Sequence, residues 1–209
     1  MSAQPDDPET DSTFEGVDFS DTVLADQRWS KRSYQSCSFL DADLNGLRTE
    51  NVTFTDCDFT GADLRGSVHH GSAFRSCNFV RTSLWHSEFH HCTLIGSVFD
   101  NCRVRPLVLD EVDLTLTSLG RIDLRGVDLT GCRLREANLV DADLRKAVLR
   151  DADLSGARTS GLKLDDADLR GARLDAGLWV GASLSGALIE TMQALAFAGA
   201  HGLRVNLQE

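Results

Sequence analysis

Large apolar residues recur at every fifth position along almost the whole chain. The series runs from Phe14 to Ile189 without an insertion or deletion, and we call its members the central positions. Only Thr49, His69 and Thr159 among them are not large and apolar. A period of five fits neither an α-helix, at about 3.6 residues per turn, nor a β-strand, at 2. The pattern therefore indicates an internal repeat.

A second position, predicted to point inward, lies two residues before each central one. It carries mainly Ala, Ser, Thr, Val and Cys, whereas the other three positions of each five are mostly Asp, Asn, Arg, Ser, Thr and Gly. One five-residue unit then forms one side of a coil, and four units close a square turn of about 20 residues. With about 4.8 Å between coils, about nine coils make a rod of roughly 43 Å.

The 20-residue turn also predicts which aromatic side chains stack. Residues 20 positions apart should lie above one another in successive coils. The chain provides two such sets, Phe19, Phe39, Phe59, Phe79 and Phe99 on one side, and Phe14, Phe54 and Phe74 on a second.

The repeating unit, small–polar–Leu/Phe–polar–polar, is clearest in "DADLRKAVLRDADLSGA" at 141–157. It resembles the pentapeptide-repeat family over residues 14–189. This resemblance implies an all-β fold, a right-handed quadrilateral β-helix. We expect a disordered acidic N-terminal tail over 1–13, the β-helix over 14–189, and a C-terminal capping and dimerisation helix over 190–209.

After Ile189 the spacing becomes helical. Thr191 is the expected N-cap, and Gly202 is expected to end the helix in a left-handed turn. Met192 and Leu195 would lie on one face with Ala196, which leaves Phe197 to find a second surface. The residues leave open whether this helix only covers the last coil or also forms a dimer contact.

Charge and hydropathy narrow the possible partners. Asp and Glu number 32 against 21 Lys and Arg, for a net charge of −11. Such a chain repels nucleic acid and membrane phosphates and attracts basic partners. No apolar stretch is long enough to span a membrane, and the N-terminal stretch has no apolar core of the kind a signal peptide carries. We therefore expect a cytoplasmic protein with no direct nucleic acid binding and no membrane contact.

No residue pattern points to catalysis, a cofactor or a metal. All six cysteines fall on inward positions and are expected to be buried free thiols. His69 occupies a central position and is expected to be a satisfied core residue, whereas His70 and His90 are 20 apart and should stack. The chain lacks nucleophile, Walker and dinucleotide motifs and has no loop insertion to build a cleft. It is therefore not expected to be an enzyme.

The remaining candidate is the surface, where acidic residues are unevenly placed. The side through Phe89, Leu109 and Leu129 has several carboxylates with no Lys or Arg among them, while Asp100 and Asp141 lie on the side of the Phe19 ladder. The candidate binding residues are Glu88, Asp110, Glu111, Asp128, Asp100 and Asp141. Duplex DNA carries one charge per about 1.7 Å, so any imitation of DNA by this chain must be local.

Stretches such as "RPLVLDEVDLTLTSLG" and "AFAGAHGL" are similar to the mycobacterial fluoroquinolone-resistance members of the family. That likeness implies a homodimer joined through its C-terminal ends that binds DNA gyrase in place of DNA, inhibits it and protects against quinolones. The implied dimer interface is Trp179, Met192, Leu195 and Phe197. The many Arg of the second half, including Arg125, Arg135, Arg145 and Arg150, depart from a uniformly DNA-like charge. A scaffold module with another protein partner is the alternative.

Overall fold

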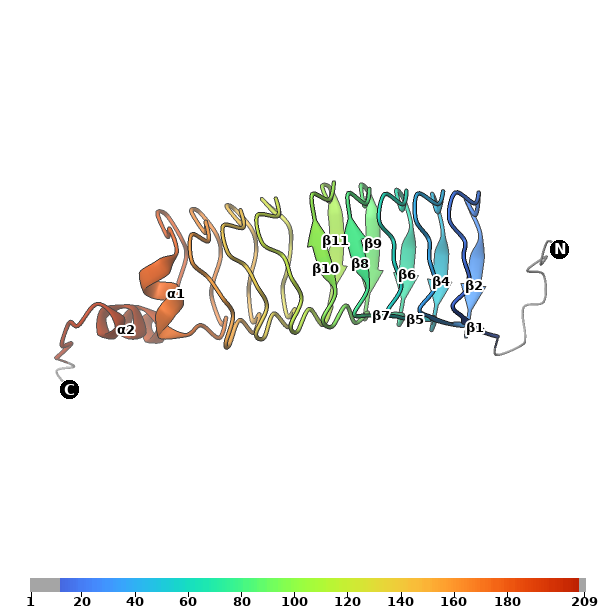
Figure 1. Cartoon of the computed structure of the whole chain (residues 1–209). Coiled ribbons are helices and arrows are strands. Elements are labelled where there is room, and N and C mark those ends of the chain that lie inside the picture. Colours follow the sequence, from blue (N-terminus) through green and yellow to red (C-terminus); the bar gives the residue numbers. More distant parts are fainter. Residues whose placement is uncertain (1–11, 207–209) are drawn as a thin grey trace.

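The computed structural model describes residues 12–206, which form a straight rod of stacked coils (Figure 1). Its strands are parallel, and each residue pairs with the residue 20 positions away, as Phe14 does with Tyr34 and Phe79 with Phe99. The predicted quadrilateral β-helix is confirmed. Residues 1–11 of the expected N-terminal tail lie outside the described part of the chain.

Regular strands mark three sides of the rod. The first sheet contains β1 (Thr13–Glu15), β3 (Ser33–Gln35), β5 (Thr53–Thr55) and β7 (Ala73–Arg75). The second pairs β8 (Asn78–Val80) with β10 (Val98–Asp100). The third contains β2 (Arg28–Ser30), β4 (Arg48–Glu50), β6 (Val68–His70), β9 (Ser87–His90) and β11 (Leu107–Asp110). Within 12–206 the fourth side has isolated bridges only, such as Val23 with Asp43.

Fewer coils contain regular β-strands than the number of coils expected from the sequence. The longest sheet is five strands deep, whereas about nine coils were expected. Beyond the strands, isolated bridges continue the same 20-residue step, from Ala73 through Thr93 and onward to Arg173. Each coil therefore still bonds to its neighbours where extended segments are too short to be strands.

The two predicted aromatic ladders fill the first half of the core. Phe39 and Phe59 stack with ring centroids 4.9 Å apart, and Phe59 and Phe79 at 5.0 Å. On the neighbouring side Tyr34, Phe54 and Phe74 stack at 5.0 and 4.7 Å. Stacked rings across such spacings add to the apolar burial that drives folding.

Tight turns connect the sides of the coil and explain why Gly, Asp and Asn are common at the polar positions of the repeat. The residue two after each central position frequently has a left-handed backbone, as Asp41 does at φ +52° and Gly61 at φ +72°. Asn and Asp tolerate this conformation better than most residues, and Gly adopts it freely. At Gly61 a Cβ would also collide with Oδ1 of Asp41 in the preceding coil. These turns therefore favour Gly, Asp and Asn, although other residues, such as Lys31 and Leu116, also adopt this conformation.

A short helix, α1 (Ala176–Gly181), interrupts the last coil, where the sequence predicts another regular unit. Leu178 replaces the polar residue that usually precedes a central position, and Trp179 follows it. Adjacent residues of a strand point to opposite sides, so a strand cannot bury both side chains. The helical turn buries both.

The C-terminal helix α2 (Thr191–Ala200) is fastened to the end of the rod. Its N-cap is Glu190 rather than the predicted Thr191, because Glu190 and Gln193 form a reciprocal capping box. The Gln193 side chain also donates to the carbonyls of Leu169 and Ala172, at 2.7 and 2.9 Å. Gly202 has φ +75°, as predicted for the end of the helix.

The apolar stripe predicted for α2 was assigned to the wrong face. Phe197 packs edge-on against Trp179, with ring centroids 5.9 Å apart, and contacts the core. Met192 is 73% exposed instead. The anchoring contacts of Gln193 and Phe197, four residues apart, turn the helix so that Met192 points outward.

Removing one ring from the stacked ladder should destabilise the whole rod. Phe59→Ala deletes a fully buried ring between two stacked neighbours. We expect a loss of about 3–5 kcal/mol in the free energy of unfolding, from lost burial and the cavity left behind. Denaturant unfolding followed by circular dichroism measures it. The control, Val23→Ala at a 77% exposed position, should change stability by less than about 0.5 kcal/mol; equal effects would contradict the ladder's role.

Candidate functional site

Four of the six predicted acidic residues gather on one side of the rod. Glu88 and Asp110 lie on the paired strands β9 and β11, and Asp128 lies one coil further along. We call Glu88, Asp110, Glu111 and Asp128 the acidic face. Two coil steps separate Glu88 from Asp128, so the acidic face is about 10 Å long.

A histidine lies in the middle of the acidic face. His90 Nε2 is 3.1 Å from a Glu88 carboxylate oxygen, and its Nδ1 is 3.1 Å from one of Asp110. The His70 ring stacks on it at 4.7 Å, as predicted. The hydrogen bonds to Glu88 and Asp110 raise the pKa of His90. A second pair, His91 with Glu111, lies beside it at 3.3 Å.

The sequence analysis missed this bridging role of His90. It recognised the His70–His90 stack but assigned no carboxylate to it. The available signal was the 20-residue step from His90 to Asp110, with Glu88 two residues before His90 on the same outward-facing strand.

Basic residues bound the acidic face at both ends. Arg28 and Arg48 pair on the same sheet toward the N-terminus. Toward the C-terminus Arg150 and Arg170 both bond to Asp168. The acidic face is therefore a local patch in the middle of the rod, with cations on either side along the axis.

Asp100 and Asp141 do not join this patch. Asp100 ends β10, which belongs to a different sheet from β9 and β11. Asp141 N donates to Ser160 O at a turn on the side of the Phe99 ladder. A flat partner that covers the acidic face cannot also touch both of these carboxylates.

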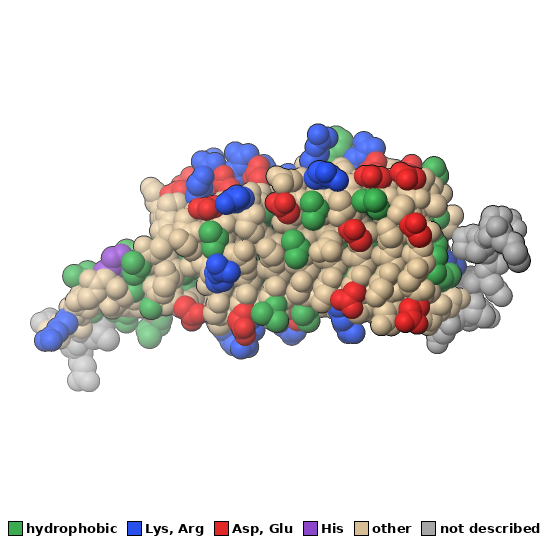
Figure 2. Space-filling view, in the orientation of Figure 1, with side chains coloured by type: hydrophobic (Ala, Val, Ile, Leu, Met, Phe, Trp, Pro, Cys, Tyr) green, Lys and Arg blue, Asp and Glu red, His purple; other side chains and the backbone are tan. Residues whose placement is uncertain are grey.

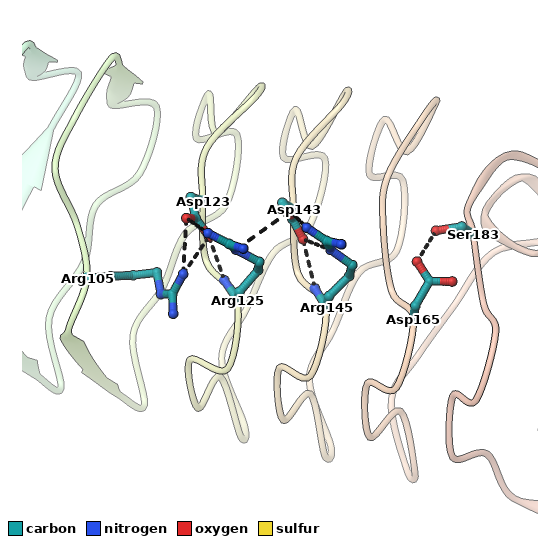
Figure 3. A network of polar contacts seen from close by, with 7 residues as sticks. All are labelled: Arg105, Asp123, Arg125, Asp143, Arg145, Asp165 and Ser183. Atoms are coloured by element: carbon teal, nitrogen blue, oxygen red, sulfur yellow. Dashed lines mark hydrogen bonds and ion pairs between the residues drawn. The ribbon is translucent and has the colours of Figure 1, made fainter.

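A neighbouring side carries alternating arginines and aspartates (Figure 3). Asp123 lies between Arg105, at 3.0 Å, and Arg125, at 2.7 Å. Asp143 lies between Arg125, at 3.7 Å, and Arg145, at 2.6 Å. These guanidinium groups lower the pKa of both carboxyls, so the network stays ionised.

The remaining predicted polar residues serve the core. His69 is fully buried, with Nδ1 2.8 Å from Thr49 Oγ1 and Nε2 2.9 Å from Ser67 Oγ, and burial lowers its pKa to about 3. The prediction of a satisfied core histidine is confirmed. Five of the six cysteines are buried, and Cys102 is half-buried. Within residues 12–206 no three His, Cys, Asp or Glu side chains gather as a metal site would require.

The C-terminal end of the rod exposes apolar side chains (Figure 2). Besides Met192, the chain exposes Val180, Leu188, Leu203 and Val205 there. Of the predicted dimer-interface residues, Leu195 and Phe197 are half-buried, and Trp179 is buried beneath Phe197. Trp179 therefore supports this surface from below. None of the helices between residues 12 and 206 has the length and apolar character needed to cross a bilayer.

Comparison with known proteins identifies the repeat. The family described as pentapeptide repeats matches in eight copies, over residues 37–68, 108–145 and 122–161. The pentapeptide repeat protein MfpA of Mycobacterium tuberculosis (strain ATCC 25618 / H37Rv) is 63% identical over 46 residues. That match covers 22% of this chain and spans a quarter of the length of MfpA.

Solved structures share the fold at lower identity. QnrB1, a plasmid-mediated fluoroquinolone resistance protein, superposes with a TM-score of 0.64 at 20% identity, over 92% of this chain and 99% of that structure. HetL, a pentapeptide repeat protein involved in heterocyst differentiation regulation in the cyanobacterium Nostoc sp. strain PCC 7120, gives 0.63 at 23% identity, over 85% and 86%. These two proteins have different described roles, so their likeness to this chain concerns the fold alone. The repeat matches and the coil of four five-residue sides agree, and the chain carries pentapeptide repeats over the matched residues.

Proposed function

We propose that this chain is a cytoplasmic DNA mimic that binds DNA gyrase through its acidic face, inhibits supercoiling and protects against quinolones. The observation that carries the proposal is the density of charge on the acidic face. Over about 10 Å, duplex DNA carries about six phosphate charges. The acidic face presents four carboxylates over the same length on a rigid support, which is a closer match than the net charge of −11 gives for the rod as a whole.

The physical mechanism is competition for a basic surface. Gyrase holds DNA against positively charged groups, and the acidic face is drawn to the same groups. The rod is already ordered, so little conformational entropy is lost on binding. Gyrase occupied in this way cannot hold the cleaved DNA that quinolones trap. QnrB1, described as a fluoroquinolone resistance protein, shows that a rod of this fold is compatible with such a role.

A scaffold role with a different protein partner is the second candidate. The likeness to HetL, whose described role is regulation of heterocyst differentiation, is as strong as the likeness to QnrB1. This alternative uses the rod as a passive platform and predicts no effect of the purified protein on supercoiling.

Reversing the acidic face should abolish gyrase inhibition. We expect the quadruple variant Glu88→Lys, Asp110→Lys, Glu111→Lys and Asp128→Lys to lose inhibition by at least about tenfold, since like charges now meet. Supercoiling assays with purified gyrase measure it, and inhibition by the unaltered protein should weaken as salt rises.

The matched control is Asp100→Lys with Asp141→Lys, on another side of the rod. It should retain inhibition if the acidic face is the contact. Inhibition that survives in the quadruple variant, or that ignores salt, contradicts the proposed contact. No inhibition by the unaltered protein favours the scaffold role.

His90 should make inhibition depend on pH. Below its raised pKa, His90 is cationic and subtracts a charge from the acidic face, so inhibition should weaken as pH falls. The expected change is about two- to fivefold, in line with exposed ion pairs. Inhibition assays at pH 6 and pH 8 measure the change. At each pH, the inhibitory concentration of the unaltered protein is divided by that of His90→Gln, which removes the pH response of gyrase itself.

Folding stability should respond to pH in the opposite direction. A raised folded pKa means that the stabilising contribution of His90 is full below the unfolded value, near 6.5, and disappears as pH rises through the folded value. At pH 6 the midpoint of unfolding should therefore lie at a higher denaturant concentration for the unaltered protein than for His90→Gln. At pH 8.5 the two midpoints should be equal. A constant difference would contradict the ionic role of His90 between Glu88 and Asp110.

The exposed apolar end should form a homodimer interface. We propose that α2 and the preceding turn meet a second copy of the chain, which buries Met192, Leu188 and the outer edges of Leu195 and Phe197. Met192→Lys with Leu188→Lys places two charges in that interface and should give a monomer. Light scattering after size exclusion measures the mass. Val23→Lys, an exposed apolar position in the first coil, is the control that should leave the dimer intact.

A further inference from the structure

One outward column of the rod combines arginines with an exposed tryptophan. Residues 65, 85, 105, 125 and 145 are each 20 apart and read Arg, Trp, Arg, Arg, Arg. Backbone bonds place them in successive coils, since Gly66 N donates to Trp85 O and Gly126 N to Arg145 O. At about 4.8 Å per coil the column is about 19 Å long.

Two neighbouring hollows follow this column. One, of about 440 Å³, is lined by Arg65, Trp85, Arg103 and Arg105 among others. The other, of about 580 Å³, is lined by Arg105, Arg125, Arg145 and Lys146, with Asp165 and Asp166 at its C-terminal end. Arg105 lines both, so they lie next to each other along the rod, and we call the two hollows together the groove.

The guanidinium groups in the groove are held in place before any ligand arrives. Asp123 and Asp143 each bond to two of Arg105, Arg125 and Arg145 (Figure 3). Asp143 is the less exposed member of its pairs, with an 18% exposed side chain against 43% for Arg145. The carboxylates thus orient the arginines, and a ligand immobilises less free side chain when it binds.

The groove is cationic although the chain is acidic. The residues that line the two hollows include six basic side chains and three carboxylates, Asp123, Asp165 and Asp166. Arg103 and Lys146 are exposed, and within residues 12–206 neither forms a salt bridge. We call Trp85, Arg103, Arg105, Arg125, Arg145 and Lys146 the arginine face.

Trp85 is the exposed tryptophan of the chain. Its side chain is 48% exposed and lies beside His86, with ring centroids 4.7 Å apart. Trp29 and Trp179 are 4% and 3% exposed. An indole on the surface between arginines offers a stacking plane next to positive charge, which is how proteins bind unpaired bases with their phosphates.

We propose that the arginine face binds a segment of single-stranded nucleic acid, with a base stacked on Trp85 and phosphates along the arginine column. The column has room for about five nucleotides at the roughly 3.4 Å spacing of stacked bases. The net charge alone predicts repulsion, but the acidic face lies on a different side, and screening at physiological salt acts over about 8 Å. This inference does not rest on gyrase binding.

An acidic protein segment is the rival occupant. It would use the arginines but not the indole, since carboxylates gain nothing specific from a stacking plane. The exposed Trp85 is therefore the observation that favours nucleic acid, and its contribution separates the two ligands.

Binding of a short fluorescein-labelled oligothymidylate, followed by anisotropy at low and at physiological salt, tests the proposal. The unaltered protein should bind, and Trp85→Ala should weaken binding about 5- to 100-fold.

Arg103→Gln with Lys146→Gln removes two cations outside the Arg–Asp network. It should lower the slope of log affinity against log salt by about 1.4. The matched control is Arg133→Gln with Arg173→Gln, two exposed cations on the opposite side, which should leave the slope unchanged.

A second readout needs no variant. Unlabelled oligothymidylate should quench the intrinsic fluorescence of the unaltered protein, because Trp85 is exposed and the other two tryptophans are buried. Trp85→Phe, which keeps an aromatic plane, should retain most of the affinity. Absence of binding at low salt, equal binding by Trp85→Ala, or tighter binding of a polyglutamate peptide at the same site would overturn the proposal.

Discussion

The ladder of backbone hydrogen bonds between coils is the constraint on which the rest of this molecule depends. Phe39 N donates to Asp58 O at 2.7 Å, and Phe59 N donates to Asn78 O at 2.8 Å. The same step recurs along the rod, so most backbone groups of a coil are satisfied only by the coils on either side. Side chains 20 residues apart are thereby forced into contact, and the stacked rings of the core follow from that register.

The same constraint turns the surface into straight columns about 4.8 Å apart along the axis. Two like charges in neighbouring coils repel each other unless something lies between them. The chain answers this problem in two ways. On the arginine face, Asp123 and Asp143 are each shared by two guanidinium groups. On the acidic face, His90 lies between Glu88 and Asp110. The acidic face and the arginine face therefore lie on different sides of one thin rod. Their opposite charges suit them to different partners.

The C-terminal end of the rod requires a different solution, because the last coil has no further coil to bond to. Unpaired backbone at such an end is a site of unwanted strand pairing. Gln193 satisfies the carbonyls of Leu169 and Ala172, while Phe197 covers Trp179. A helix can do this because its own backbone is bonded internally. It cannot hide all of its apolar residues, and Met192 remains outside as the basis of the proposed dimer.

The spacing of apolar residues alone determined the coil, the two aromatic ladders, the inward cysteines and the core position of His69. Each follows from counting in fives and twenties, since the repeat fixes the direction of a side chain wherever the coil is regular. The sequence also separated the acidic residues by side. Tertiary structure alone decided where the repeat yields to a helix at Leu178 and Trp179, and that Glu190 caps α2. It also decided that His90 bridges two carboxylates and that Met192 rather than Phe197 faces outward. These outcomes depend on how particular side chains rotate and which neighbour they reach, and a periodic pattern carries no information about either.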